Sequence, residues 1–348
     1  MYKKYLITGA TGFLGRNVID RLVPTDAQIF ALCMPSDPFV EKLPPEVVPV
    51  CGDVRDETSL AGFFDNADES SCVIHCAGIV SVASRPGRGI YDVNVGGTRN
   101  VLSFCLDRGV AKCVYVSSVH AIPEKPSGTL IDENAEFSPE LVYGDYSKSK
   151  AEATRLVFDA AKRGLDASVV FPSGIIGPGD EARGSITSML SSYLAGKLPY
   201  AVKGGYDFVD VRDVADGIVS CAVNGKRGEG YILSGHYVTI KEIVDVVKEI
   251  TGMKKKVVYF PMCVAKAVAP TYERIAVRKK QKLFFTPYAV KVLSSNGRFS
   301  NEKARELLGY NPRPVSETLK DAVAWIGHES SACAESAAFR PHEKAHGK

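Results

Sequence analysis

A glycine-rich turn directly after a short apolar run constrains the fold of this chain more than any other feature. The run at 5–8 is followed by Gly9-Ala10-Thr11-Gly12-Phe13-Leu14-Gly15, and apolar residues then recur at helical spacing. A strand, a glycine turn and a helix in this order let the backbone approach a pyrophosphate, which the free N–H groups of the helix N-terminus would hold. We therefore interpret the turn as a dinucleotide-binding element and expect the fold to be organised around it.

Further apolar runs alternate with helix-like segments. We expect strands at 28–32, 47–51, 72–76, 113–117 and 167–171, and helices at 91–108 and 146–164. Short connections between them predict an α/β fold, a Rossmann-type doubly wound parallel sheet with a smaller C-terminal substrate-binding lobe. The expected division is an NAD(P)-binding domain at 1–172, a mainly substrate-binding lobe at 173–328 from which some strands and helices return to the first domain, and a disordered tail at 329–348.

Composition and charge exclude several kinds of partner. The net charge of +3 gives no reason to expect a nucleic acid partner. The apolar segment 260–269 is interrupted by Lys266 and is too short to span a bilayer, so we expect no integral membrane segment. Nine cysteines occur without a paired CxxC spacing, which favours reduced thiols, no metal site and a cytoplasmic location.

Tyr146 and Lys150 form a candidate acid–base pair at the start of the helix expected at 146–164. At this spacing the two side chains share a helix face and can meet. An unperturbed tyrosine has a pKa near ~10, and a positive charge beside it lowers that pKa toward the range useful for acid–base catalysis. The alternative is an ordinary pair on a solvated helix face. Ser117 and Ser118 lie at the end of the strand at 113–117, the edge where ligands bind in an open parallel sheet.

In their order along the chain, these motifs resemble those of the extended short-chain dehydrogenase/reductase superfamily. The resemblance covers residues 5–325 and rests on the glycine turn at 8–15, Gly52-Asp53-Val54, Ala77-Gly78, Asn94-Val95, Ser117-Ser118 and Tyr146 with Lys150. It implies an enzyme that binds NAD or NADP and a small-molecule substrate. It also implies a homodimer formed through the helices that contain Tyr91 and Tyr146.

Two branches of that superfamily imply different reactions. Residues 171–180 and 206–215 resemble the dihydroflavonol reductase and 3β-hydroxysteroid dehydrogenase-like branch, which transfers hydride between the nicotinamide and a carbonyl or secondary alcohol of an apolar substrate. The alternative is a nucleotide-sugar epimerase/dehydratase with tightly bound NAD. Tyr206 counts against it, because an arginine suited to a diphosphate is common there. A non-catalytic dinucleotide-sensing protein is the second alternative, against which the retained Tyr146 and Lys150 count.

The resemblance also assigns roles to individual residues. Tyr146 would transfer the proton, Lys150 would lower the phenol pKa and hold the nicotinamide ribose, and Ser118, with Ser117 as its rival, would orient the substrate oxygen. The residues expected to bind the cofactor are Gly9, Thr11, Gly12, Phe13, Leu14, Asp53, Val54, Ala77, Gly78, Tyr146, Lys150, Pro172, Ser173 and Ile175. Asp53 is equally well explained as a turn or helix cap.

The sequence leaves the cofactor type and the pocket partly open. An acid directly after the second strand is typical of NAD sites and an arginine of NADP sites, but residues 33–36 contain neither and Asp37 comes later. The sequence therefore does not indicate which of the two cofactors is bound. His75, inside an apolar run, is expected to be a core histidine, whereas His120 either touches the substrate or lies on the surface. We expect Val80, the loop after His120, Ile175 and the later lobe to line the substrate pocket.

Overall fold

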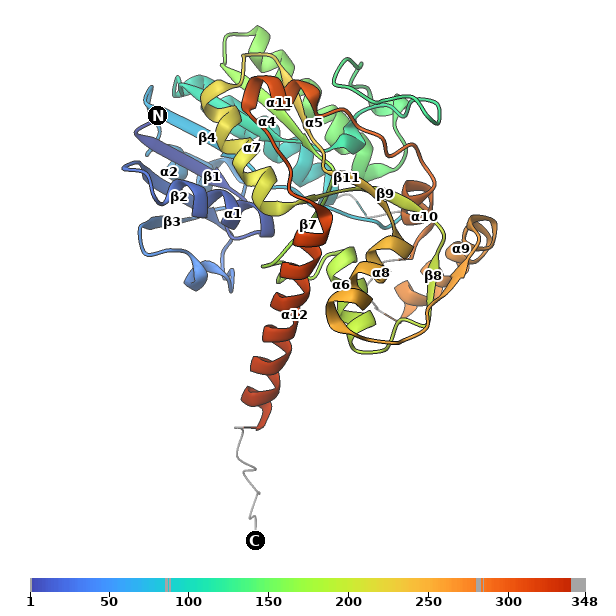
Figure 1. Cartoon of the computed structure of the whole chain (residues 1–348). Coiled ribbons are helices and arrows are strands. Elements are labelled where there is room, and N and C mark those ends of the chain that lie inside the picture. Colours follow the sequence, from blue (N-terminus) through green and yellow to red (C-terminus); the bar gives the residue numbers. More distant parts are fainter. Residues whose placement is uncertain (1, 85–86, 88, 280–282, 284, 339–348) are drawn as a thin grey trace.

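The centre of the molecule is a seven-stranded parallel sheet in the order β10-β6-β5-β4-β1-β2-β3 (Figure 1). The computed structural model describes residues 2–84, 87, 89–279, 283 and 285–338. The strands are β1 (Lys4–Thr8), β2 (Gln28–Cys33), β3 (Val47–Cys51), β4 (Ser71–His75), β5 (Lys112–Val116), β6 (Ala167–Pro172) and β10 (Gly230–Leu233). The strand order reverses between β1 and β4, so the predicted Rossmann-type doubly wound sheet is confirmed.

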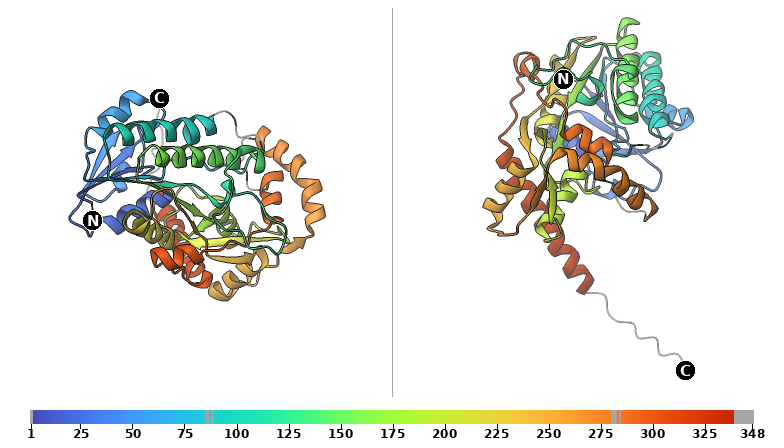
Figure 2. Two further views of the ribbon diagram at one scale, coloured as in Figure 1. Left: turned by 90° about the horizontal axis from the view of Figure 1, so that it is seen from above. Right: turned by 90° about the vertical axis from the view of Figure 1, so that its right-hand side faces the viewer.

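Helices cover both faces of this sheet (Figure 2). One face carries α2 (Glu57–Phe64), α4 (Thr98–Asp107) and α5 (Asp145–Lys162), and the other carries α1 (Phe13–Leu22), α7 (Val211–Asn224) and α11 (Glu302–Leu308). Side chains alternate between the two faces along each strand, so Leu6 joins one core while Tyr5 and Ile7 join the other. Both cores are apolar, which explains why the strands read as continuous apolar runs.

The helix expected at 91–108 is divided into three segments. A single turn, α3 (Gly89–Tyr91), leads into a π-helical segment, Asp92–Gly97, before α4 begins at Thr98. Such π-helical segments are rare and often occur at functional sites. The segment carries Asn94, whose side chain is buried.

The smaller lobe is built from two further sheets and the helices around them. One sheet has the order β11-β9-β7 and the other pairs β12 with β8. The strands are β7 (Gly174–Ile176), β8 (Tyr200–Val202), β9 (Gly205–Asp210), β11 (His236–Thr239) and β12 (Val258–Phe260), and the helices are α6 (Ser185–Leu194), α8 (Ile240–Thr251), α9 (Met262–Arg278) and α10 (Pro287–Leu293). From this lobe the chain returns to the central sheet as α7, β10 and α11. The division of the chain into domains stays a prediction.

The C-terminal helix α12 (Val315–Ala338) projects from the body of the molecule (Figure 1). Its first part is fixed by buried Leu319, Ala322 and Ile326. Residues 329–338, which we expected in a disordered tail, continue this helix. Alanine and glutamate in this stretch favour propagation of a helix whose first turns are already packed. Residues 339–348 lie outside the described part of the chain.

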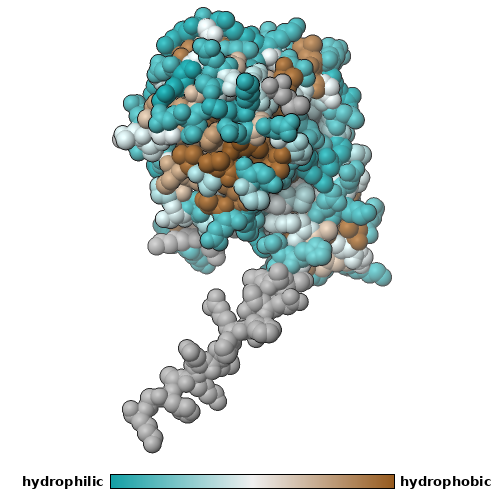
Figure 3. Space-filling model, turned by 90° about the vertical axis from the view of Figure 1, so that its left-hand side faces the viewer, coloured by the Kyte–Doolittle hydropathy of each residue, from teal (hydrophilic) through white to brown (hydrophobic). Residues whose placement is uncertain are grey.

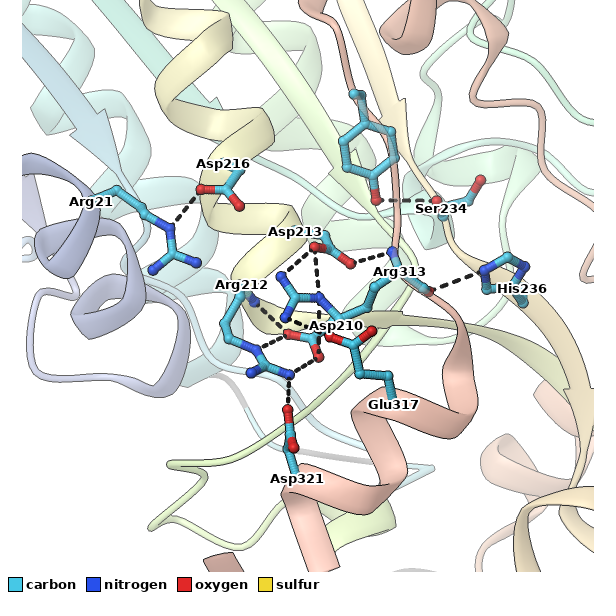
Figure 4. Close-up of polar contacts among 11 residues, drawn as sticks. Arg21, Asp210, Arg212, Asp213, Asp216, Ser234, His236, Arg313, Glu317 and Asp321 are labelled. Atoms are coloured by element: carbon cyan, nitrogen blue, oxygen red, sulfur yellow. Dashed lines mark hydrogen bonds and ion pairs between the residues drawn. The ribbon is translucent and has the colours of Figure 1, made fainter. Parts of the chain in front are cut away.

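A cluster of arginine and aspartate side chains fastens the start of α12 to α7 (Figure 4). Asp210, the N-cap of α7, accepts hydrogen bonds from Arg212 Nε at 2.9 Å and Nη2 at 2.7 Å, and its side chain is 0% exposed. Arg212 also pairs with Asp321 of α12 at 2.8 Å. Arg313 donates to Asp213 through Nε at 2.9 Å and Nη2 at 2.8 Å. The cluster therefore links two segments that are far apart in the sequence, 210–213 and 313–321.

Hydrophobic residues gather on the side of the molecule viewed in Figure 3, the side on which the edge strand β3 lies in Figure 1. In β3, Val48 is 47% exposed. Pro49 interrupts the row of N–H donors along this edge, which disfavours pairing with another strand. Within the part of the chain that the structure describes, every helix is too short or too polar to cross a bilayer.

Candidate active site

The glycine turn is packed so closely that side chains would not fit at two of its positions. Gly9 has a φ of +67°, and a Cβ there would lie 2.7 Å from the backbone N of Ala77. A Cβ at Gly15 would lie 2.1 Å from the carbonyl oxygen of Gly9. Gly12, the N-cap of α1, provides no side-chain cap for the N–H groups of the first helical turn, where Phe13 and Leu14 lie. The turn therefore fits the pyrophosphate of a dinucleotide.

Asp53 and Val54 lie beyond the end of β3, farther along the same edge of the sheet. The Asp53 carboxylate accepts from Arg55 Nη2 at 2.6 Å and from the Arg55 backbone N–H at 2.9 Å, and these hydrogen bonds lower the pKa of Asp53. The side chain thus caps the turn, one of the two roles that the sequence left open. Val54 is buried against Gly97, where a Cβ would lie 2.6 Å from its Cγ2. Contact of either residue with an adenine stays a prediction.

Asn94 holds the loop after β4 in place. Its Oδ1 accepts from the backbone N–H of Ile79 at 2.7 Å, and its Nδ2 donates to the carbonyl of Ile79 at 3.0 Å and to Ser149 Oγ at 3.0 Å. A Cβ at Gly78 would lie 3.2 Å from Asn94 Oδ1 and 3.2 Å from Lys150 Nζ. The absence of a side chain at Gly78 therefore lets this loop approach Lys150.

His75 is a core histidine, as expected. Its Nδ1 is 2.6 Å from Thr8 Oγ1 and its Nε2 is 2.9 Å from Thr98 Oγ1, and the residue is 1% exposed. Burial, together with the positive charge of Lys150, lowers the pKa of His75 to about 3. The imidazole is therefore neutral and links β1, β4 and α4 structurally.

The segment from β6 to β7 forms the far side of the expected cofactor site. Pro172 ends β6, and Ser173 connects it to β7, in which Ile175 is partly buried against the core beneath α1 and α7. Burial raises the pKa of nearby Asp207 in β9 to about 6. Thr11, on the opposite side, donates to Asp37 at 2.6 Å.

Tyr146 lies at the start of α5, where a glycine permits the required packing. Gly144 has a φ of +88°, and a Cβ there would lie 2.5 Å from the ring of Tyr288. Tyr146 is 7% exposed, and burial raises the pKa of its phenol to about 12, while a hydrogen bond with Ser118 opposes the rise. The phenol and the Ser118 hydroxyl therefore meet at the carboxyl edge of the sheet.

The two neighbouring serines have different surroundings. Ser117 Oγ is 2.7 Å from Thr154 Oγ1 on α5, in the interior. Ser118 accepts from the backbone N–H of His120 at 3.2 Å and lies close enough to Tyr146 to oppose the rise in the pKa of its phenol. Of the two candidates, Ser118 is thus the one that lies close to the phenol.

Lys150 is buried beside Tyr146, but it does not give that phenol a low pKa. Its Nζ donates to the carbonyl of Val116 at 2.8 Å and lies 5.0 Å from the ring centre of Tyr115. Burial lowers the pKa of Lys150 to about 8. The expected decrease in the pKa of Tyr146 is therefore not observed. Burial raises this pKa, and the contribution that opposes the rise comes from Ser118.

His120 is not the surface histidine that the sequence allowed. Its ring is stacked on Tyr206 at 5.5 Å, and it lies edge-on to Tyr146 at 5.8 Å and 6.0 Å from Tyr288. Nε2 is 3.2 Å from the Tyr206 hydroxyl, and burial lowers the pKa of His120 to about 4. Its position just after Ser118 was the available sequence signal. Tyr288, whose hydroxyl is 3.0 Å from Ser147 Oγ, gave no such signal.

A cavity of about 340 Å³ is bordered by His120, Tyr206 and Tyr288, and its other lining residues come from 119–147 and 291–299. This size is typical of small-molecule sites. The loop after His120 and the later lobe line it, as expected. Val80 and Ile175 do not line it, because Val80 is 74% exposed and Ile175 packs against the opposite core. Of the expected pocket residues, those after His120 and in the later lobe thus border this cavity, and their contact with a substrate stays a prediction.

Comparison with known proteins agrees with this geometry. A model of the NAD dependent epimerase/dehydratase family matches residues 5–234. The chain is similar to sterol demethylase protein B of Methylococcus capsulatus, with 29% identity over 92% of this chain and 97% of that protein. It is also similar to a putative dihydroflavonol 4-reductase of Synechocystis, with 29% identity over 92% and 94% of the two chains. The crystal structure of gox2253 shares 30% identity with a TM-score of 0.81, covering 94% of this chain and 98% of the other.

Proposed function

We propose that this chain, which belongs to the NAD dependent epimerase/dehydratase family, transfers hydride between NAD(P) and a carbonyl or secondary alcohol of an apolar substrate. It is an NAD(P)-dependent oxidoreductase of the extended short-chain dehydrogenase/reductase type. The observation that carries the proposed reaction is the placement of Ser118 near the buried phenol of Tyr146 at the edge of the sheet, with Lys150 buried one helical turn later on α5. A non-catalytic sensor would not need this arrangement.

In the proposed reduction, Ser118 and Tyr146 would both hydrogen-bond the substrate oxygen. Tyr146 would then donate its proton to that oxygen, while Ser118 keeps the oxygen in position. The bound nicotinamide supplies or accepts the hydride. Lys150 would hold a hydroxyl of the adjoining ribose and place a positive charge near the phenolate that forms. The raised pKa keeps Tyr146 protonated before the reaction, so proton transfer would rely on the positive charge of Lys150 to stabilise the phenolate.

The surroundings of the site support an apolar substrate. Valine, isoleucine, leucine and phenylalanine side chains contribute much of the cavity lining, together with the rings of Tyr206 and Tyr288. Tyr206 is stacked on His120. Because a tyrosine carries no positive charge, this position offers no cation to a nucleotide diphosphate. The names of the relatives, a sterol demethylase protein and a dihydroflavonol reductase, agree with a polycyclic or aromatic substrate. We further expect a cytoplasmic homodimer.

The test compares Tyr146→Phe with Tyr200→Phe, a control at a tyrosine that is 60% exposed. Purified variants would be supplied with ketones and steroids and with NADH or NADPH, and cofactor oxidation would be followed at 340 nm. Loss of a proton donor should lower turnover by roughly 10²–10⁴-fold, while dinucleotide binding measured by calorimetry persists. Near-normal turnover in Tyr146→Phe would contradict the mechanism. Cofactor retained through purification, with no net oxidation of added NADH or NADPH, would favour an epimerase instead.

A further inference from the structure

Asp37 contacts the glycine turn, although several residues separate it from the end of β2. A left-handed residue, Ser36 with a φ of +60°, turns the chain back, so that Asp37 Oδ2 accepts from Thr11 Oγ1 at 2.6 Å. Asp37 Oδ1 accepts from the backbone N–H of Phe39 at 2.9 Å, which fixes the carboxylate. Between the glycine turn and the end of β2 lies the ribose of the adenosine in folds of this type, where an acid binds the 2′-hydroxyl of NAD.

Two cations lie against Phe39, two residues after Asp37. Arg16 of α1 and Lys42 of the short helix Val40–Lys42 flank the ring of Phe39, at 5.8 Å and 5.7 Å from its centre. Either side chain is long enough and suitably charged to receive the 2′-phosphate of NADP. Whether these two cations are already paired therefore decides whether a 2′-phosphate can be bound at this site.

Both cations are bound by a single carboxylate from the other lobe. Glu181, in the segment after β7, accepts from Arg16 Nη1 at 2.7 Å and from Lys42 Nζ at 2.5 Å. Arg16 Nη2 also donates to the carbonyl of Gly179 at 2.8 Å. The side chains of Glu181 and Arg16 are each only 17% exposed, so the pair is poorly screened by solvent. A phosphate would therefore compete with Glu181 for both cations.

We propose that the protein selects NAD over NADP and that Glu181 is a specificity-determining residue, because it occupies the two cations that would otherwise bind a 2′-phosphate. Asp37 contributes by presenting a second negative charge where that phosphate would lie. This inference rests on the proposed dinucleotide-dependent function. It assigns a cofactor preference to a residue outside the strand and turn that contact the adenosine.

The experiment measures binding of NAD⁺ and NADP⁺ to the full chain by calorimetry, so no turnover is needed. Glu181→Gln is compared with Glu41→Gln, which removes the same charge from an exposed residue next to Lys42. The wild-type protein should bind NAD⁺ at least about tenfold more tightly than NADP⁺. Glu181→Gln should strengthen NADP⁺ binding about tenfold, since a charged hydrogen bond to phosphate becomes available, with NAD⁺ affinity nearly unchanged. Glu41→Gln should leave the ratio unchanged.

A second variant distinguishes a role of Glu181 in cofactor specificity from a role in merely holding the segment after β7 in place. Adding Lys42→Met to Glu181→Gln should cancel much of the gain in NADP⁺ affinity, whereas Lys42→Met alone should leave NADP⁺ binding as it is. Equal binding of both dinucleotides by the wild type would overturn the inference, as would an equal loss of both affinities in Glu181→Gln. Binding of neither dinucleotide by the wild type would overturn the proposed function and the inference together.

Discussion

Removal of the Arg212 guanidinium should destabilise the protein strongly. Arg212→Met would take away both side-chain donors to Asp210, whose carboxylate is completely buried. Breaking one side of a buried ion pair costs roughly 3–5 kcal/mol. Here Arg212 is 21% exposed, Arg313 lies 3.7 Å from the same carboxylate, and the Arg212 backbone N–H still donates to it. We therefore expect a decrease of about 2–3 kcal/mol in the free energy of unfolding, measured by urea denaturation.

The matched control is Arg21→Met, which breaks a second arginine–aspartate pair in the same region (Figure 4). Arg21 and Asp216 are 31% and 53% exposed, so their pair should contribute less than about 1 kcal/mol. Equal losses in the two variants would refute the reasoning, because burial would then not determine the magnitude.

The difference between wild type and Arg212→Met should also depend on pH. Burial by itself would raise the pKa of Asp210, but the hydrogen bonds from Arg212 outweigh it and the pKa is lowered. A lowered carboxyl pKa stabilises the fold above the unfolded pKa of about 3.9 and loses this effect as the pH falls below it. In Arg212→Met, burial is no longer outweighed and raises the pKa of Asp210. The difference should therefore be full where Asp210 is ionised in both proteins and shrink as the pH falls from the raised pKa of the variant toward the lowered pKa of the wild type. A constant difference from pH 7 to pH 3 would contradict this assignment.

Three further predictions concern the site. Ser118→Ala should lower turnover by roughly 10²-fold or more with little effect on unfolding, whereas Ser117→Ala should mainly lower stability because its partner is Thr154; the reverse pattern in kinetics and denaturation would exchange their roles. Because burial lowers the pKa of Lys150 to about 8, ketone reduction should decline as the pH rises through that value, and a flat rate from pH 7 to 10 would speak against a charged Lys150. Gly12→Val should abolish dinucleotide binding, and an unchanged calorimetric affinity would exclude the glycine turn as the pyrophosphate site.

The central sheet could be predicted from the sequence because its inner strands are buried on both faces. Each reads as a short apolar run, and β1 through β6 lie where such runs occur. The π-helical segment at Asp92–Gly97 was not predictable, because sequence patterns do not distinguish its wider turn from a turn of an α-helix. The helical state of residues 329–338 was missed, because alanine-rich composition suits both a helix and a disordered tail.

The candidate site was predictable where its residues share one edge of the sheet. Ser118 and Tyr146 were placed together because strand ends and helix starts meet there. His120, Tyr288 and Glu181 reach their positions only through the path of the chain between the lobes, which local patterns do not reveal. The direction of the Tyr146 pKa shift was missed because it depends on the balance of burial and charge, and burial cannot be read from the spacing of two residues.

The return of β10 to the central sheet has an evolutionary consequence. β10 pairs with β6, but in the chain it follows β7 and β9 of the smaller lobe. Helix α7, which lies between β9 and β10 in the chain, packs on α1. Recombination therefore could not exchange the smaller lobe as one continuous segment and leave the nucleotide-binding sheet complete. New specificities on this scaffold should instead arise by substitution and insertion in the connecting segments, such as 122–143 and 177–184, where changes in length leave the strand order untouched.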